Sequence, residues 1–211
     1  YVYGSVGIPL PGVEIKIGAE DEILVKYGGV MKGYYKNEEE TAKVFTEDGY
    51  FRTGDAGRID ENGNLYIVDR IKDLMKTSNG KYIAPQTIEI PLQSHPEISQ
   101  AMVIAEGKPY VSAVIVPDFE TLIEKYQEFK NYVSLTIEEK KKLLESPFIK
   151  EKFEKIVADI QKEFASYEKI KKFKLLPEEF TIEKGEITPT LKIKRRVVLE
   201  KLNSLIEGMY A

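Results

Sequence analysis

The 211-residue sequence has no cysteine, a single histidine and no long apolar run. Without cysteine the chain can form no disulfide, no thiolate metal site and no cysteine nucleophile, and this composition is compatible with a reducing, cytoplasmic compartment. The one histidine, His95, lies directly before Pro96 and is expected to serve as a loop or cap residue, so we predict no metal site. No apolar stretch approaches the roughly 18–20 residues that span a bilayer, and no signal peptide is recognisable.

An excess of basic residues is also missing. The chain has 31 Lys and Arg against 35 Asp and Glu, a net charge of −4, so no global basic field favours nucleic acid as a partner. The run Lys140–Lys142 is either a local nucleic-acid patch or, as we expect, the solvated face of a helix. With 42% hydrophobic and 31% charged residues, the composition is that of a globular protein of one large or two small domains.

Residues 1–69 are rich in glycine and proline and are predicted to be mostly β. Polar and apolar residues alternate over Val13–Ile17 and Glu22–Val25, as in half-buried strands. A short helix is expected over Asn37–Val44, with Asn37 as its N-cap. The run Gly4-Ser5-Val6-Gly7 lacks the pattern of a phosphate-binding loop and is expected to lead into a strand.

Residues 74–211 show a mixed pattern of short strands and helices. Pro85 is placed where a first helical turn tolerates proline, ahead of a helix over Gln86–Gln93. Asn79-Gly80 is expected to join two short strands. The other expected elements are strands at Leu74–Thr77, Lys81–Ile83, Ala101–Ala105, Tyr110–Val116 and Phe173–Leu176, and helices at Phe119–Tyr132, Ile137–Leu144, Phe148–Ser166 and from near Lys194.

The most informative stretch is Gly49–Glu89. Within it, Gly57–Asp60 and Leu65–Val68 flank Asn62-Gly63, which predicts a hairpin whose two central residues tolerate positive φ. Before the hairpin, Thr53-Gly54-Asp55 is expected to place a carboxylate at a tight, exposed bend. After it, the charged residues 69–73 are expected to connect two apolar strands.

Two motifs in this stretch resemble signatures of the adenylate-forming superfamily, which includes the acyl-CoA synthetases. Tyr50-Phe51-Arg52-Thr53-Gly54-Asp55 is similar to the family's ribose-binding motif, and Val68–Asp73 is similar to its hinge motif. A third segment, Ile187–Arg196, resembles the family's final motif, usually written Pro-x-Thr-x-x-Gly-Lys-x-x-Arg-Arg. It departs from that pattern at Leu191, where most members have glycine.

The resemblance implies roles for seven residues. Lys192 matches the lysine that bridges the acyl carboxylate and the ATP oxygens, where a reaction between two anions needs positive charge. Asp55 and Arg70 match residues that hold the ATP ribose, and Lys72 matches the pivot about which the C-terminal domain rotates. The resemblance places Lys76, Asn79 and Gly80 on the face that forms the thioester along the path of CoA.

For three of these residues the sequence also allows a purely structural or surface role. Lys192 could simply begin a basic surface helix. Asp55 could cap its own turn, and Arg70 could form a surface ion pair with Asp69 or Asp73. The turn at Asn79-Gly80 is one residue longer than the common family form, which makes the CoA assignments weaker than that of Lys192.

The resemblance implies an α+β fold in three parts. Residues 1–69 would be the end of a small β-barrel closing a large N-terminal domain, 70–73 a hinge, and 74–211 a mobile C-terminal domain with a short sheet packed by helices. The chain starts at Tyr1 without an initiator methionine, and we expect it to be part of a longer protein whose phosphate loop and acyl pocket lie upstream.

The parent protein is expected to be an ATP-dependent long-chain fatty-acid–CoA ligase that releases AMP and pyrophosphate. Its partners would be a fatty acid, ATP with Mg²⁺ bound through it, CoA, and the missing N-terminal domain; this fragment alone would be inactive. Two alternatives stay open, an adenylating enzyme that loads a carrier protein and a non-catalytic interaction module. The sequence does not decide whether the parent associates with a membrane.

Overall fold

The computed structural model describes residues 2–211, and contacts between residues divide the chain into two compact units. The first unit ends at Leu74 and the second runs from Met75 to Ala211. The division therefore lies one residue beyond the charged segment 70–73. Rotation of one unit against the other about this segment stays a prediction.

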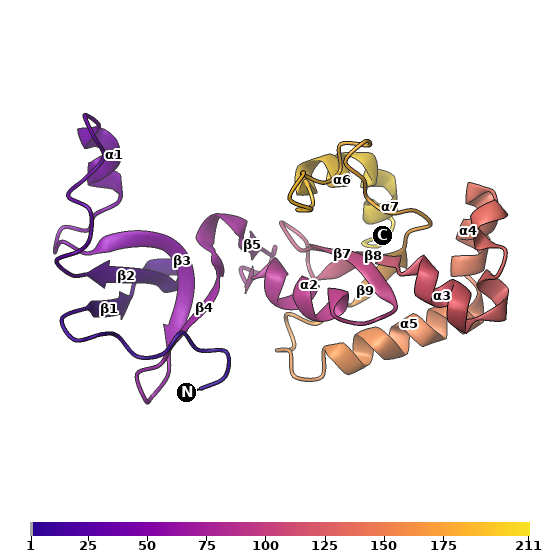
Figure 1. Cartoon of the computed structure of the whole chain (residues 1–211), viewed down its shortest axis with the longest axis horizontal. Coiled ribbons are helices and arrows are strands. Elements are labelled where there is room, and N and C mark those ends of the chain that lie inside the picture. The colour runs from indigo at the N-terminus through magenta and orange to yellow at the C-terminus, as the bar shows by residue number, and fades with distance from the viewer. Residues whose placement is uncertain (1) are drawn as a thin grey trace. The chain divides into compact units, whose positions relative to one another are not determined.

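The first unit is built on one antiparallel sheet in the order β1-β2-β3-β4, with β1 at Glu14–Ile17, β2 at Glu22–Lys26, β3 at Phe51–Ile59 and β4 at Leu65–Arg70 (Figure 1). Its helix, α1, spans Glu38–Lys43. Asn37 caps α1 as predicted, because its side-chain oxygen accepts a hydrogen bond from the Glu40 amide at 3.1 Å. The segment at Gly4–Gly7 leads into an isolated bridge between Gly7 and Leu65.

Strand β3 starts earlier than the sequence predicts. Because it starts at Phe51, Thr53-Gly54-Asp55 lies inside a strand and not at an exposed bend. Gly54 has φ +70°, so the strand kinks there in a conformation that glycine adopts at little cost. The predicted β3–β4 hairpin is confirmed, but of its central pair only Gly63 has positive φ. The turn is longer than two residues, because Asp60 accepts hydrogen bonds from the amides of Asn62 and Asn64.

The second unit is built around a three-stranded sheet, β7 (Ile98–Ile104), β8 (Ser112–Pro117) and β9 (Lys172–Leu175). β8 pairs antiparallel with β7 and parallel with β9. Successive residues of β7 and β8 enter two different cores: Val103 and Ala113 belong to one, Met102 and Val114 to the other. The sheet is therefore buried on both faces, which explains why these strands are apolar without alternation.

Helices cover both faces of this sheet (Figure 1). The first core is closed by α2 (Pro85–Gln93), α3 (Phe119–Lys125), α4 (Ile137–Leu144) and α5 (Pro147–Ile160). The second is closed by α6 (Arg195–Lys201) and α7 (Asn203–Glu207). A short hairpin of β5 (Met75–Lys76) and β6 (Tyr82–Ile83) precedes α2 and confirms the two strands predicted around Asn79-Gly80. The α+β class is thus confirmed.

Three predicted helices differ from those observed. The helix predicted over Phe119–Tyr132 ends at Lys125, because Tyr126 is extended (φ −122°, ψ 129°) and is followed by two 3₁₀ turns at Gln127–Phe129 and Tyr132–Ser134. Helix α5 ends at Ile160, and the side chain of Gln161 then accepts a hydrogen bond from the returning chain at Ile170. The last predicted helix is two helices that meet at Leu202.

Two smaller predictions are confirmed. The Nδ1 atom of His95 accepts a hydrogen bond from the Glu97 amide at 3.2 Å, a local role in the turn after α2. The solvated helix face predicted for Lys140–Lys142 is confirmed for Lys141 and Lys142, which are exposed on α4, with Lys141 paired to Glu138 one turn earlier. Lys140 differs, because it is half-buried and its ammonium lies 5.0 Å from the centroid of the Tyr132 ring. Between residues 2 and 211, no helix combines the length and the apolar character needed to cross a bilayer.

Candidate functional site

Asp55 and Arg70 are brought together in the first unit. They are register partners across the antiparallel pair β3–β4, and Arg70 Nε lies 2.8 Å from Asp55 Oδ1. The Asp55 side chain is 27% exposed and that of Arg70 is 56% exposed. The sequence left open a surface ion pair of Arg70 with Asp69 or Asp73; in the structure the Arg70 guanidinium pairs with Asp55, and the Arg70 amide donates to Asp69 Oδ1 at 2.7 Å. Within residues 2–211 no hydrogen bond uses Asp55 Oδ2, so that oxygen is available to a ligand.

A buried carboxylate shapes the kink that carries Asp55. Glu22, in β2, has a side chain that is only 10% exposed. One of its oxygens accepts a hydrogen bond from the Gly54 amide at 3.2 Å, and the other lies 2.8 Å from Arg52 Nη1. The Thr53 hydroxyl donates to the Ile23 carbonyl and accepts from the Asp55 amide. These contacts fix the backbone of Asp55 from the neighbouring strand.

Lys72 lies in a 3₁₀ turn at Ile71–Asp73, directly before the division between the two units. Its side chain is exposed. The turn is closed by the Leu74 amide, which donates to the carbonyls of Arg70 and Ile71, both at 3.2 Å. A single 3₁₀ turn has few hydrogen bonds to break, so it can absorb a change of backbone angles at low cost.

Lys76, Asn79 and Gly80 lie together on the β5–β6 hairpin of the second unit. The Thr77 amide donates to the Lys81 carbonyl and the Gly80 amide donates to the Thr77 carbonyl, each at 2.9 Å. Gly80 has φ +76° and nothing within 4 Å of where a side chain would begin, so its backbone is open to a ligand. All three residues are exposed.

The loop between β7 and β8 holds this hairpin in place. Asn79 Nδ2 donates to the Pro109 carbonyl at 3.1 Å, and the Ser78 amide donates to the Lys108 carbonyl at 3.0 Å. On the other side of the hairpin, the Lys76 amide donates to Glu106 Oε2 at 2.7 Å. The turn is thus fixed against the sheet, although Lys76, Asn79 and Gly80 are exposed.

Lys192 lies at the end of a second hairpin turn. Ile187 and Ile193 form a bridge at its base, and Ile187 is buried. The Thr188 amide donates to the Lys192 carbonyl at 2.8 Å, and Leu191, at the tip, has φ +61°. Lys192 is exposed, and within residues 2–211 its ammonium makes no hydrogen bond or ion pair. A free ammonium on a fixed turn is suited to an anionic ligand.

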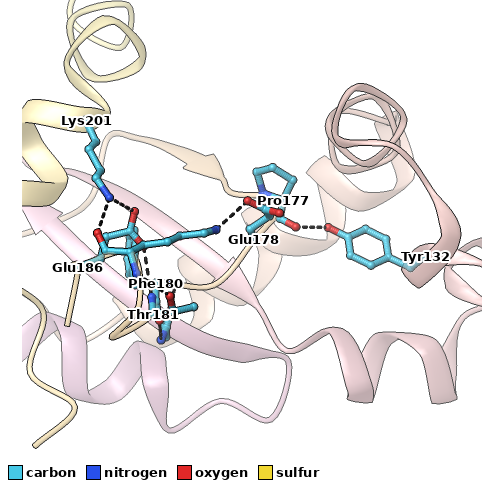
Figure 2. A network of polar contacts seen from close by, with 9 residues as sticks. Tyr132, Pro177, Glu178, Phe180, Thr181, Glu186 and Lys201 are labelled. Atoms are coloured by element: carbon cyan, nitrogen blue, oxygen red, sulfur yellow. Dashed lines mark hydrogen bonds and ion pairs between the residues drawn. The ribbon is translucent and has the colours of Figure 1, made fainter. Parts of the chain in front are cut away.

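The chain on the N-terminal side of this turn is tied to helix α6 through Glu186 (Figure 2). Its side chain is 12% exposed, with Oε1 3.1 Å from Lys201 Nζ and Oε2 accepting from the Thr181 amide at 3.2 Å. The Glu186 carbonyl accepts from the Lys194 amide at 2.7 Å. Lys201 also donates to the Lys184 carbonyl at 2.7 Å, which fastens the preceding loop to α6.

On the C-terminal side, Arg195 anchors the turn to the core of the unit. Its Nη2 atom lies 2.8 Å and 3.1 Å from the two oxygens of Glu89, and its Nη1 atom donates to the Val103 carbonyl at 2.6 Å. The Val103 amide in turn donates to Glu89 at 2.7 Å. The pair is partly buried, with 29% of the Arg195 side chain and 12% of the Glu89 side chain exposed, so desolvation offsets part of the attraction between the charges.

Sequence reasoning missed Glu22, Glu89 and Glu186. Glu22 and Glu89 are buried and Glu186 is half-buried, and each pairs with a basic residue at least 15 positions away in the sequence, as Glu89 does with Arg195. No local spacing marks such pairs. The only available signal is an acidic residue placed among apolar ones, as Glu89 is between Ile88 and Ile90.

The predicted site residues are divided between the units. Asp55, Arg70 and Lys72 belong to the first, and Lys76, Asn79, Gly80 and Lys192 belong to the second. Within residues 2–211, no group of three or more acidic or histidine side chains is placed to hold a metal ion. A cleft of about 910 Å³ along β9 is lined by other residues, Phe173, Leu175 and Glu178 among them. The exposed turns, and not that cleft, are the candidate site.

Comparison with known proteins identifies the family of this chain. The profile described as "AMP-binding enzyme C-terminal domain" matches residues 72–211. Long-chain-fatty-acid–CoA ligase FadD15 of Mycobacterium tuberculosis is 39% identical over 98% of this chain and 34% of its own length. Fatty acyl-CoA synthetase A of Dictyostelium discoideum is 32% identical over 99% of this chain and 33% of its own length. The chain thus spans about a third of the length of these curated relatives.

Solved structures agree with the sequence comparison. The A domain of the carboxylic acid reductase from Segniliparus rugosus, in complex with AMP and a co-purified carboxylic acid, matches with a TM-score of 0.67 at 26% identity. The match covers 96% of this chain and 32% of that one. The chain therefore belongs to the AMP-binding, adenylate-forming enzyme family, and its residues 72–211 match that family's C-terminal domain.

Proposed function

We propose that this chain is the C-terminal part of an ATP-dependent acyl-CoA synthetase that activates long-chain fatty acids. The relatives named as long-chain-fatty-acid–CoA ligases support the substrate class, since they align along nearly the whole chain. In the first half-reaction the fatty acid and ATP give acyl-AMP and pyrophosphate. In the second, CoA displaces AMP to give acyl-CoA.

The observation that carries the proposal is the exposed ammonium of Lys192, which forms no ion pair with any described residue (2–211), on a turn fixed from both sides. A carboxylate that attacks the α-phosphate of ATP brings two anions together, so a cation must be placed between them. Lys192 would supply this cation. Its carbonyl accepts a hydrogen bond from the Thr188 amide, and the bridge between Ile187 and Ile193 closes the base of its turn. Its side chain is free to reach toward a phosphate.

Asp55 and Arg70 would bind the ribose of ATP. A vicinal diol can donate two hydrogen bonds to one carboxylate, and Arg70 orients that carboxylate from the adjacent strand. Mg²⁺ would enter bound to the ATP phosphates, and the acyl pocket and phosphate loop would belong to the longer protein. Lys72 would act as the pivot, and the turn with Lys76, Asn79 and Gly80 would serve the thioester step.

The test uses the full-length enzyme with ATP, Mg²⁺ and CoA, and with acetate, octanoate or palmitate as the acid. Equal amounts of AMP and palmitoyl-CoA would establish both the reaction and the chain-length class. In the Lys192→Ala variant, palmitate-dependent pyrophosphate exchange should fall by about 100-fold or more, as when one preorganised charge is removed. Transfer from preformed palmitoyl-AMP to CoA should persist. Equal loss of both half-reactions would remove the assignment of Lys192.

One observation favours a carrier protein, in place of CoA, as the acceptor of the acyl group. The A-PCP didomain of the Segniliparus rugosus carboxylic acid reductase matches this chain with a TM-score of 0.65 at 26% identity. Pyrophosphate exchange without acyl-CoA would keep adenylation and move the acceptor to a carrier protein. No turnover with any acid would leave a non-catalytic interaction module.

A further inference from the structure

Strand β9 is the end strand of the three-stranded sheet, so only one of its two edges is paired. Its ladder to β8 continues to Leu176, whose amide donates to the Ile115 carbonyl at 2.9 Å. Alternate residues of a strand direct their main-chain groups to the same edge, so the amides and carbonyls of Phe173 and Leu175 point away from β8. Within residues 2–211, no other segment forms a backbone hydrogen bond with either residue. Such a row of free main-chain groups is a template for a further strand.

This free edge lies in the cleft of about 910 Å³. One wall of the cleft comes from α4 and α5, with Leu144 and Val157, and the other comes from α7, with Leu205. The two walls cover opposite faces of the sheet, because Leu144 and Val157 belong to the first core and Leu205 packs against the second (Figure 1). The cleft is therefore a groove with a strand edge between apolar walls, a site that an extended segment can enter as a fourth strand.

The side chains of β9 divide between the two faces. Phe173 and Leu175 pack against the first core. Successive residues of a strand point to opposite faces, so Lys172 and Lys174 lie on the face of the second core, as does Val114, the register partner of Lys174. A strand added beside β9 would therefore place one set of alternate side chains next to apolar residues and the other set next to lysines.

The lysines at this edge are poorly neutralised by the rest of the chain. Within residues 2–211, Lys171 and Lys172 are exposed and form no ion pair, and Lys174 reaches Glu145 only at 3.9 Å. All the acidic residues that line the cleft lie outside β9. Opposite charges that neighbour each other on adjacent strands stabilise the pair of strands, and like charges destabilise it. The charge of β9 therefore favours an acidic neighbour.

We infer that the free edge of β9 binds an extended peptide segment of a partner protein in which acidic and apolar residues alternate. The acidic side chains of the segment lie beside Lys172 and Lys174, and its apolar side chains lie beside Phe173 and Leu175. Its main chain pairs with the free amides and carbonyls of Phe173 and Leu175. A second copy of β9 is a poor occupant, because its own lysines would neighbour those of the first copy. The inference is independent of the reaction that the full-length protein catalyses.

The experiment measures the binding of fluorescent peptides to the full-length protein by anisotropy. The probe is a peptide with blocked ends in which valine and glutamate alternate. One control peptide alternates valine and lysine, and another has the composition of the probe with its glutamates grouped together. We expect only the alternating valine–glutamate peptide to bind the wild-type protein.

Reversing the charge of the edge should reverse this preference. In the double variant Lys172→Glu/Lys174→Glu, affinity for the valine–glutamate peptide should fall by about tenfold or more, and the valine–lysine peptide should bind instead, which also shows that the variant is folded. Lys142→Glu reverses an exposed charge on α4 outside the cleft and is the matched control. It should change the affinity by less than about twofold, since isolated surface charges contribute little. Unchanged affinity in the double variant would overturn the inference.

Two measurements on the wild-type protein separate strand pairing from simple charge attraction. A valine–glutamate peptide with methylated main-chain nitrogens has no amide donors and should bind at least about tenfold more weakly. Hydrogen exchange of the amides at residues 172–175 should slow when the unmodified peptide is bound. Equal binding of the methylated or the grouped peptide would indicate a general surface for anions, of the kind that an acidic lipid would use, and would overturn the inference. Absence of binding by the valine–glutamate peptide would overturn it as well.

Discussion

Asp55 and Arg70 face each other across β3 and β4, with Arg70 Nε 2.8 Å from Asp55 Oδ1. They lie 15 positions apart in the sequence, and the hairpin turn at Asp60–Asn64 brings them into register. Asp55 is half-buried and Arg70 is exposed, and the backbone directly before Asp55 is held by Glu22, which accepts a hydrogen bond from the Gly54 amide. Arg70 therefore holds the Asp55 carboxylate in one orientation, and no hydrogen bond within residues 2–211 uses its Oδ2 atom, which can accept one from a ligand.

The first prediction concerns this carboxylate. Asp55→Asn in the full-length enzyme should raise the KM for ATP by about tenfold to 100-fold, because a hydrogen bond to a charged group contributes ~1.5–3 kcal/mol. The KM for palmitate should be unchanged. Asp48→Asn is the control, since Asp48 forms an exposed ion pair with Lys16 in the same unit. An unchanged KM for ATP in Asp55→Asn would return Asp55 to a structural role.

The second prediction concerns the pivot. Lys72→Pro fixes φ near −65° and should impair one half-reaction more than the other, since it limits the angles that the 3₁₀ turn can adopt. A several-fold difference between the loss of pyrophosphate exchange and the loss of palmitoyl transfer is expected. Lys72→Ala, which keeps the backbone free, should be near wild type in both. Normal rates in Lys72→Pro would show that no rotation occurs at this position.

The third prediction concerns Glu186 and Lys201. Glu186→Ala removes the carboxylate that accepts hydrogen bonds from Lys201 and from the Thr181 amide. The amide hydrogens of residues 187–194 should therefore exchange with solvent faster, by about tenfold for each 1.4 kcal/mol of local stability that is lost. Pyrophosphate exchange should fall while palmitoyl transfer is spared. The control is Glu200→Gln, whose carboxylate pairs with Arg196 on the exposed face of α6. Unaltered hydrogen exchange of the amides at residues 187–194 would contradict this role of Glu186.

The fourth prediction concerns Leu191. A left-handed conformation costs a residue other than glycine, asparagine or aspartate ~1–2 kcal/mol. Leu191→Asn should therefore raise the free energy of unfolding of the second unit by up to ~1 kcal/mol, whereas Leu191→Val, a β-branched residue, should lower it by a similar amount. Urea unfolding measures both. The reverse order would show that the side chain of Leu191, which is 72% exposed, has a packing role.

The fifth prediction concerns pH. Burial raises the pKa of the Glu97 carboxyl, but contacts with Lys152, Lys125 and the Tyr126 hydroxyl outweigh it, so its pKa lies below the usual 4.5. Because the folded pKa is lowered, the contribution of Glu97 is complete above the unfolded pKa and is lost as pH falls through the folded value.

Glu97→Gln should therefore lower the free energy of unfolding by about 2 kcal/mol at pH 7, and the difference from wild type should shrink below pH 4. Urea titrations at the two pH values test this. Glu151→Gln, which removes an exposed pair with Lys155, should change little at either pH. A difference that is constant with pH would show that the ion pairs of Glu97 do not stabilise the fold.

Much of the local structure follows from local sequence. Asn37 as a cap, Pro85 in the first turn of α2, the Asn79-Gly80 hairpin and the apolar strands of β7 and β8 were all predictable, because each depends on residues within a few positions. Helix ends were less predictable. Tyr126 ends α3 although its neighbours have helical spacing, because the chain there turns so that Phe129 can enter the core.

The family, the order of the motifs and the candidates Asp55, Arg70 and Lys192 could be read from contiguous residues alone. The folded chain was needed to show that Arg70 pairs with Asp55, that Glu186 and Lys201 brace the Lys192 turn, and that Glu89 anchors Arg195. These partners lie between 15 and 106 residues apart. No short sequence pattern encodes such pairs, because the partners come together only when the strands, loops and helices that carry them fold against each other.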